Sequence, residues 1–269
     1  MERKKRNAVI RIVVCAIIIA ALISVLMAGI RGHVGFPFIS INFGGNSYSN
    51  ADKYTSGDIT YSADSLDELY IDWVSGDIQI EVYEGDVIDI YETESEKLSK
   101  EDRVHSYFED GVLRIQYRKA AAWGFSFREM NKDLHIRIPR KLNDADKILD
   151  EMSIDNVSAN ITINDIHVDN YHVDTVSGDV TFTGNLKQLN IEAVSGSSYI
   201  TSGVTPENIN TDTVSGEVTL TVPADSKFAI DFDSVSGDLT NAFPTLSDDK
   251  ENEWEFESVS GDVSIQSLQ

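Results

Sequence analysis

Acidic side chains recur along this chain at a spacing that could build a cation site. Eight related segments centre on VSGD, and six of them place an acid at the fourth motif position: Asp58, Asp77, Asp179, Glu217, Asp238 and Asp262. Asn160 and Ser197 take that position in the other two segments. Ca²⁺ prefers carboxylate oxygens of this kind as ligands. Asp179, Asp238 and Asp262 are therefore weak metal candidates. The alternative is that the Ser and Asp side chains bond backbone N–H groups and fix a turn.

Other residue types give weaker signals for chemistry. His167 and His172 lie beside several aspartates. Five residues apart on an extended chain, they point to opposite faces unless a bend intervenes, so a shared zinc site is not expected. No GxSxG elbow accompanies the serines, and close carboxylate pairs, as in glycosidases, are expected by chance among so many acids. The sequence therefore predicts no catalytic residue, no cofactor-binding residue and a protein that is not an enzyme.

One segment combines basic and aromatic side chains, which suits contact with a partner. Of the 16 basic residues after Arg31, nine lie between Arg103 and Lys141. The partner-binding candidates come from the stretch QYRKAAAWGFSFRE and are Arg118, Lys119, Trp123, Phe125, Phe127 and Arg128. Such a tip could contact an anionic wall polymer, the membrane surface or a partner protein. It could equally cover the open end of a repeat array.

The spacing of the VSGD copies indicates which elements position these residues. The third motif residues are 57, 76, 159, 178, 196, 216, 237 and 261, so a period near twenty runs through six consecutive copies. Each copy is rich in Val, Ile and Thr, with apolar residues at every second position, which predicts strands. We therefore expect an all-β fold, a parallel β-solenoid of ~20-residue VSGD coils stacked about 4.8 Å apart. A propeller of antiparallel repeats, the alternative, would need units of roughly forty residues.

A change of apolar parity predicts a corner at each motif. Ile230 and Phe232 keep one parity, whereas Val235, Gly237 and Leu239 keep the other. Such a slip would turn the apolar side chains of a flat strand to solvent, so we expect a bulge or corner just before the valine. After it, the valine, the glycine and the next apolar residue should point inward, and the serine and the acid outward. The glycine would fit where two walls of the coil approach closely.

An uncharged run near the N-terminus predicts a membrane anchor. The run from Ile12 to Ile30 is long enough, at ~1.5 Å per residue, to cross roughly 30 Å of hydrocarbon. Five basic residues precede it and Arg31 follows closely, so the positive-inside rule places the N-terminus in the cytoplasm. A cleaved signal peptide is the alternative, but the run is long for one and no A-x-A site follows it. We expect a single-pass protein of the cell membrane with its C-terminal domain outside.

Composition divides the chain into four expected parts. They are a cytoplasmic tail (1–7), a transmembrane anchor (8–30), a linker (31–54) and a β-solenoid ectodomain (55–269) with an irregular strand and hairpin insertion at 97–150. Residues 32–269 hold 16 basic and 44 acidic residues, a formal net charge of −28. Such a charge argues against a nucleic-acid partner and favours cations or basic partners. Cys15, the only cysteine, lies within the expected anchor, so no disulfide would hold the fold.

The repeats resemble a known bacterial family. One N-terminal anchor, multiple xSGDV units, the DGVLRI strand and strands ending in IPRK or VPAD are similar to the domain-of-unknown-function family labelled "putative adhesin". This family includes LiaG-like membrane proteins of Gram-positive bacteria, and the resemblance covers about residues 50–269. It implies a link to envelope stress.

Together, the resemblance and the residues predict a non-enzymatic, extracytoplasmic binding or scaffold protein of the bacterial cell envelope. Its expected partner is a cell-wall polymer or a membrane or envelope protein. An enzyme acting on cell-wall or surface polysaccharide is the alternative function, since repeat folds of this kind can host such sites. No cofactor is expected, although the acidic motif positions leave Ca²⁺ open.

Overall fold

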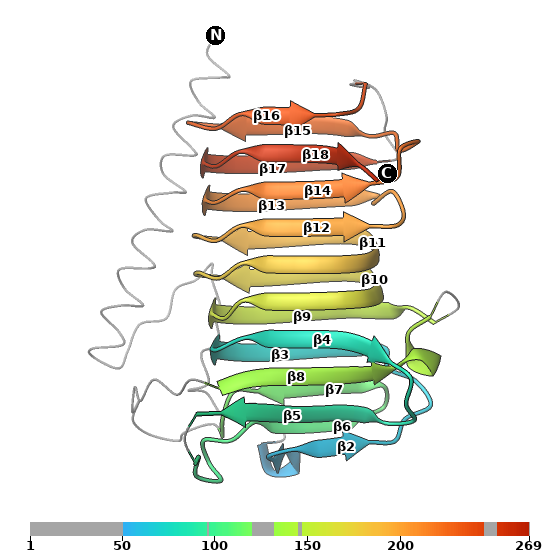
Figure 1. Cartoon of the computed structure of the whole chain (residues 1–269), viewed down its shortest axis with the longest axis vertical. Helices are drawn as coiled ribbons and strands as arrows, with labels where there is room; N and C mark the ends of the chain where they lie inside the picture. The colour runs from blue at the N-terminus through green and yellow to red at the C-terminus, as the bar shows by residue number, and fades with distance from the viewer. Residues whose placement is uncertain (1–50, 96, 120–131, 145–146, 245–251, 269) are drawn as a thin grey trace, which may run out of the picture.

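The protein is an elongated stack of β-strands with almost no helix (Figure 1). The computed structural model describes residues 51–95, 97–119, 132–144, 147–244 and 252–268. Within these ranges the helical elements are two short 3-10 turns, η1 (Ala51–Lys53) and η2 (Arg140–Leu142). The all-β class expected from the sequence is confirmed. The expected anchor at 8–30 lies outside the described residues, and among those described no helix has the length and apolar character needed to cross a bilayer.

Two facing layers of strands make up the stack, and two long strands, β10 (Ile161–Thr175) and β11 (Val180–Ala193), run through both. In the orientation of Figure 1 the front layer also contains β16 (Leu239–Asn241), β18 (Val263–Ser267), β14 (Val218–Val222), β12 (Ser198–Ser202), β4 (Ile78–Tyr83), β8 (Lys132–Pro139), β5 (Ile88–Glu94) and β2 (Ile59–Tyr61). Behind it lie β15 (Ala229–Ser234), β17 (Glu253–Ser260), β13 (Asn208–Ser215), β9 (Leu149–Ser158), β3 (Glu68–Ser75), β7 (Val112–Gln116), β6 (His105–Glu109) and β1 (Thr55–Ser56).

Parallel pairing between coils follows the motif period. Ile161 pairs with Val180, Val180 with Ser198, and Ser198 with Val218. Each of these residues follows the fourth position of its own VSGD copy, so the motifs lie in register along the stack. This gives the solenoid-like arrangement that the repeats predict.

The order of the stack departs from the order of the chain. The last coil, β17 and β18, lies between the coil of β13 and β14 and the coil of β15 and β16. At the other end β7 and β8 pair in parallel with β3 and β4. Four antiparallel strands, β6, β5, β1 and β2, then close that end. A period in the sequence predicts similar coils, but it does not say which coil lies next to which.

Apolar side chains fill the space between the two layers. Along β3, for example, Leu69, Ile71 and Trp73 are buried and alternate with more exposed residues. Near the C-terminal end Trp254 is fully buried, and its ring stacks on that of Phe228 with the ring centroids 3.7 Å apart. Its indole N–H donates to the carbonyl oxygen of Pro206. The core is therefore a narrow continuous column that runs the length of the stack.

The corner at each motif lies at the glycine, which corrects the expected bulge before the valine. Strands β3, β9, β13 and β17 continue through the motif valine and serine. The valine was expected to point inward, and this is wrong, since Val74 is 36% exposed and Val235 is 67% exposed. The parity changes at the third motif position. There Gly57, Gly76, Gly178, Gly196 and Gly216 adopt positive φ, +118° at Gly178, a conformation that other residues rarely take.

The same glycine brings neighbouring coils together. A Cβ added at Gly178 would lie 2.1 Å from the carbonyl oxygen of Ala159 on the adjacent coil, and one at Gly216 would lie 1.9 Å from the carbonyl oxygen of Gly196. The close approach expected from the sequence is therefore real, but it occurs between stacked coils and not between the two walls of one coil.

Candidate functional site

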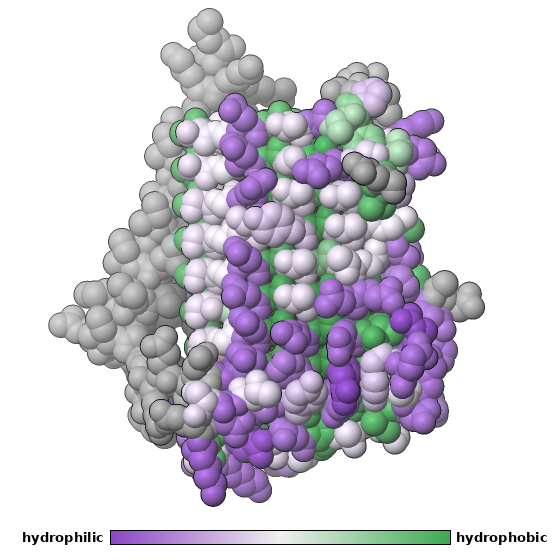
Figure 2. Space-filling model, in the orientation of Figure 1, coloured by the Kyte–Doolittle hydropathy of each residue, from purple (hydrophilic) through white to green (hydrophobic). Residues whose placement is uncertain are grey.

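Two of the acids at the fourth motif position bind the backbone of a neighbouring coil. Asp179 Oδ1 accepts a hydrogen bond from the N–H of Ser197 at 2.8 Å, and Asp262 Oδ1 accepts one from the N–H of Asp238 at 2.9 Å. Asn160 does the same for the N–H of Asp179. Figure 2 shows hydrophilic columns on the front face that run along the stack. The geometry gives Asp179 and Asp262 a structural role in joining coils, the alternative that the sequence left open.

The basic and aromatic segment is described only in part. Trp123, Phe125, Phe127 and Arg128 lie outside the described residues. Lys119 is exposed and lies 3.9 Å from Glu101. Arg118 is half-buried and also has an interaction partner. The expected partner-binding tip therefore stays a prediction.

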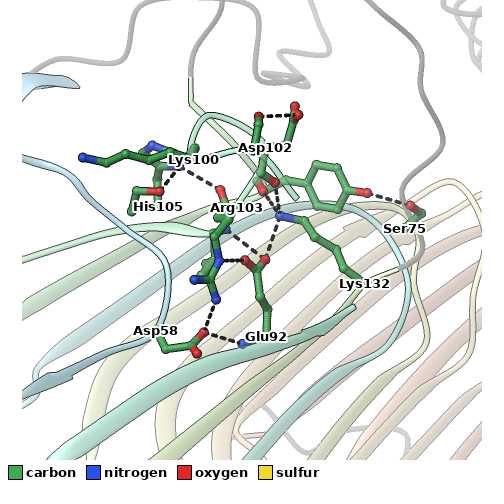
Figure 3. Close-up of polar contacts among 12 residues, drawn as sticks. Asp58, Ser75, Glu92, Lys100, Asp102, Arg103, His105 and Lys132 are labelled. Carbon is green, nitrogen blue, oxygen red and sulfur yellow. Dashed lines mark hydrogen bonds and ion pairs between the residues drawn. The ribbon is translucent and has the colours of Figure 1, made fainter. Parts of the chain in front are cut away.

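Other basic side chains of that segment form ion pairs. Arg103 contacts Asp58 and Glu92, Arg137 contacts Asp89, Arg140 contacts Glu84 and Asp165, and Lys141 contacts Asp86. Figure 3 shows the most buried of these contacts, in which Lys132 and Arg103 converge on Glu92. Local acids thus compensate much of the positive charge, and the cluster in Figure 3 joins strands β5 and β8 rather than facing a ligand.

A row of seven carboxylates crosses the outer face of the back layer. In-register pairing places each acid beside the next, in the order Asp72, Asp155, Asp174, Glu192, Asp212, Glu257 and Asp233. Neighbouring strands lie about 4.8 Å apart, and like charges directly opposite each other destabilise a sheet. We call this set the acidic row. Side chains that destabilise the fold are expected mainly at functional sites, so the acidic row is a candidate functional site.

The crowding shifts the proton affinity of the acidic row. Burial, together with the charges of Asp72 and Asp174, raises the pKa of Asp155 to about 7. Burial also raises the pKa of Asp72, which hydrogen-bonds to Asp155. Further along, burial and the neighbouring acids raise the pKa of Glu192. Burial and the nearby acids therefore favour the protonated form of Asp155, which hydrogen-bonds to Asp72.

Amide side chains line a groove beside the acidic row. The groove encloses about 370 Å³ over strands β9, β10, β11 and β13. Its polar side chains are Glu151, Asn170, His172, Gln188, Asn190, Asn208 and Asn210. We call it the amide groove. It lies on the same outward face as the acidic row, because its residues precede members of that row by two or four positions on each strand.

Two kinds of amide occupy this groove. Asn210 Nδ2 donates to Asn190 Oδ1 at 2.9 Å, and Asn190 Nδ2 lies 2.9 Å from His172 Nδ1. Such an asparagine ladder stabilises stacked strands. Gln188 and Asn208 are exposed, and their side chains make no hydrogen bond to any other residue in the described ranges. These two free amides are available to a ligand.

The sequence contained a signal for the acidic row that motif reasoning missed. An acid stands two residues before the motif valine in every copy from Val74 to Val259. This second column of acids is separate from the column formed by the acids after the motif glycine. His172 was also placed wrongly, because the chain turns between Val168 and Tyr171, both buried, so His167 and His172 both point outward. His172 lies beside Asp174 and Asp155, not beside His167.

A family model matches the part of the chain that forms most of the parallel coils. Residues 148–253 match the family model described as Toastrack DUF4097. The likeness to this family covers 106 of the 269 residues. The resemblance to a "putative adhesin" domain-of-unknown-function family, expected from the repeats, is confirmed. The matched Toastrack residues include all of the amide groove and most of the acidic row.

Three solved structures were compared with this chain. A "putative cell adhesion protein" from Clostridium sporogenes covers 80% of this chain and 100% of its own, with 16% identity and a TM-score of 0.50. A "putative adhesin" from Bacteroides fragilis has 14% identity, covers 80% of this chain and 97% of its own, and has a TM-score of 0.43. A "putative lipid binding protein" from Parabacteroides distasonis has 15% identity, covers 79% of this chain and 97% of its own, and has a TM-score of 0.34. The first likeness shows the fold alone, and no curated protein matches the chain.

Proposed function

We propose that this protein is a non-enzymatic binding protein of the bacterial cell envelope, whose Toastrack domain binds a cell-wall glycan in the amide groove. The observation that carries the proposal is the pair of free amides, Gln188 and Asn208, within a groove of about 370 Å³. An amide offers a donor and an acceptor side by side, which matches the hydroxyl and acetamido groups of a sugar.

The arrangement of the groove favours a repeating, uncharged polymer. Asn170, Gln188 and Asn208 are paired in register on consecutive strands, so one amide recurs about every 4.8 Å along the stack. An extended glycan presents a similar set of groups from one ring to the next. The adjacent acidic row would repel a polyanion, so an uncharged or amino-bearing glycan suits the groove better than an anionic wall polymer.

A binding titration tests the groove. The full chain in detergent would be titrated with an oligosaccharide of six β-1,4-linked N-acetylglucosamine units, with isothermal titration calorimetry as the measurement. We expect binding that weakens at least tenfold in Gln188→Ala/Asn208→Ala, because both amides are lost while the backbone pairing stays. Gln79→Ala/Gln266→Ala is the matched control, since both side chains are exposed on the front layer.

Two results would contradict this function. One is the absence of binding by the unchanged chain, or equal weakening in the control variant. The other is cleavage of the oligosaccharide, which would favour the alternative of a polysaccharide-degrading enzyme. The variant Trp123→Ser/Phe125→Ser/Phe127→Ser should bind normally, and loss of binding there would move the site to the basic and aromatic tip.

The location is part of the proposal. Residues 8–30 would anchor the chain in the cell membrane, with residues 1–7 in the cytoplasm and the β-solenoid ectodomain outside. A membrane-impermeant maleimide should label Ser236→Cys in intact cells, since Ser236 is exposed at the edge coil. Labelling only after lysis would contradict this orientation. Cys15 would be replaced by Ser beforehand, so that one thiol reports the result.

A further inference from the structure

Three potential metal ligands from two strands meet at one end of the amide groove. Asp155 on β9, and His172 and Asp174 on β10, can each direct one ligand atom to a common place, where these atoms lie within 4.8 Å of one another. His172 and Asp174 share a face because they are two residues apart on one strand, and Asp155 pairs in register with Asp174. An imidazole thus stands beside the acidic row at this point.

One atom of this set is poorly satisfied within the protein. Asp174 Oδ1 is shielded from solvent and makes no aligned hydrogen bond, although it lies 3.3 Å from His172 Nε2. A buried carboxylate oxygen without such a bond costs free energy. We propose that Asp155, His172 and Asp174 bind a divalent metal ion, with Zn²⁺ as the preferred ion.

The ligand types decide between metals. Ca²⁺ and Mg²⁺ take oxygen ligands, whereas Zn²⁺ accepts imidazole nitrogen together with carboxylate oxygen. Tetrahedral bonds of about 2.0–2.2 Å place zinc ligands about 3.4 Å apart, so atoms within 4.8 Å need only side-chain rotations to close on an ion. Two carboxylates and an imidazole leave a fourth position for water, or for Asp72 or Glu192, the next members of the acidic row.

Asn190 can hold the imidazole in the orientation that metal binding needs. Its side-chain amide lies 2.9 Å from His172 Nδ1. With the side-chain amides of Asn190 and Asn210 both turned over, Asn190 Oδ1 would accept a hydrogen bond from the Nδ1–H of His172, and Asn190 Nδ2 would donate to Asn210 Oδ1. This keeps the ladder and leaves Nε2 free for the metal, the usual arrangement for a ligating histidine. Asn190 is therefore a positioning residue, and His172 Nε2, which faces Asp174, is the metal ligand.

Calorimetry on the EDTA-treated full chain, titrated in turn with ZnCl₂, MnCl₂ and CaCl₂, tests the site. We expect one Zn²⁺ per chain, bound at least tenfold more tightly than Ca²⁺. The affinity for Zn²⁺ should fall at least tenfold in His172→Gln and in Asp174→Asn. Matched controls are His135→Gln on the front layer and Asp179→Asn at a motif corner, and both should bind Zn²⁺ normally.

Further measurements keep the test decisive if a variant is less stable. Circular dichroism would confirm that each variant folds, and Co²⁺ added in place of Zn²⁺ should give visible absorption bands that His172→Gln shifts. No Zn²⁺ binding, or equal loss in His135→Gln, would overturn the site and leave His172 and Asp174 as an ion pair. Because no glycan is present and Gln188→Ala/Asn208→Ala should still bind Zn²⁺, failure here is separate from failure of the proposed function.

Discussion

The ammonium group of Lys132 and the carboxylate of Glu92 lie 2.9 Å apart, and both side chains are fully buried. Lys132 also donates to the carbonyl oxygens of Asp102 and Tyr117 and lies over the ring of Tyr117. Burial lowers the pKa of Lys132 to about 8, and the charge of Glu92 opposes that shift. Each charge therefore offsets the cost of burying the other. The pair lies where the antiparallel end of the stack meets the parallel coils.

Removing the cation should unfold this end of the molecule. We expect Lys132→Met to lower the free energy of unfolding by about 3 kcal/mol, since it leaves the buried Glu92 carboxylate with the partly exposed Arg103 as its remaining counter-charge. Urea unfolding measures this loss. Lys132→Met/Glu92→Leu should recover most of it, because no uncompensated charge remains, and a double variant as unstable as the single one would contradict the explanation.

Local patterns predicted the coil but not the stack. Alternating apolar residues and the period near twenty indicate the paired strands correctly, because each coil repeats the same pleat and the same corner. Lys132 lies in the one long stretch without the motif, and its burial depends on Glu92, forty residues earlier. Contacts of this kind leave no local pattern, so the sequence suggested an exposed basic residue instead.

The corner glycine gives a second prediction. Gly178→Ala should lower the free energy of unfolding by about 1–3 kcal/mol, since the new Cβ would meet the Ala159 carbonyl and the residue would keep a positive φ. Gly203→Ala is the control, because there the nearest atom is the end of the Asn185 side chain, which can rotate away. Equal losses of unfolding free energy in the two variants would contradict a special role for the Ala159 contact and the positive φ of Gly178.

The inserted last coil gives a third prediction. Ser215 on β13 pairs in register with Ser260 on β17, and paired Cα atoms about 4.8 Å apart suit a disulfide. In a chain with Cys15 replaced by Ser, we expect Ser215→Cys/Ser260→Cys to form a disulfide on mild oxidation. Non-reducing electrophoresis and mass spectrometry measure it.

The control for coil order uses the coil that precedes the last one in the chain. Ser236 follows β15, which β17 separates from β13, so Ser215→Cys/Ser236→Cys should not cross-link within one molecule. Efficient cross-linking of this pair, with none for the first, would mean that the coils stack in chain order. The repeats are alike in sequence, so only such long-range contacts decide between the two orders.

The sequence predicts only part of the acidic row, the metal ligands and the amide groove. The acids before each motif valine were visible, but which side chains they approach depends on strand pairing and on the bend between Val168 and Tyr171. On one flat strand His167 and His172 would lie on opposite faces, but the bend brings both to the outer face. The amide groove, built from Asn and Gln of separate coils, has no motif of its own.

The raised pKa of Asp155 gives a pH prediction. The pKa of Asp155 is raised from 3.8 to about 7 in the folded protein, so the folded chain binds more protons than the unfolded chain between these values. The contribution of Asp155 to stability is therefore largest below about pH 4 and falls as the pH rises to about 7. In EDTA, we expect thermal unfolding to record a falling midpoint across that window. Asp155→Asn should flatten the fall, because Asn carries no charge.

Burial and, after it, the charges around Asp155 set the size of this effect. Asp72 and Asp174 repel its charge, whereas His172 and Arg114 reduce the net negative charge nearby. Relief of one like-charge contact, about 1 kcal/mol near 4 Å in water, should raise the midpoint of Asp155→Asn at pH 8 by about 2–4 °C. Adding Asp72→Asn should contribute little more, because removing the charge of Asp155 already relieves its repulsion with Asp72. An unchanged slope in both variants would place the pH dependence elsewhere in the acidic row.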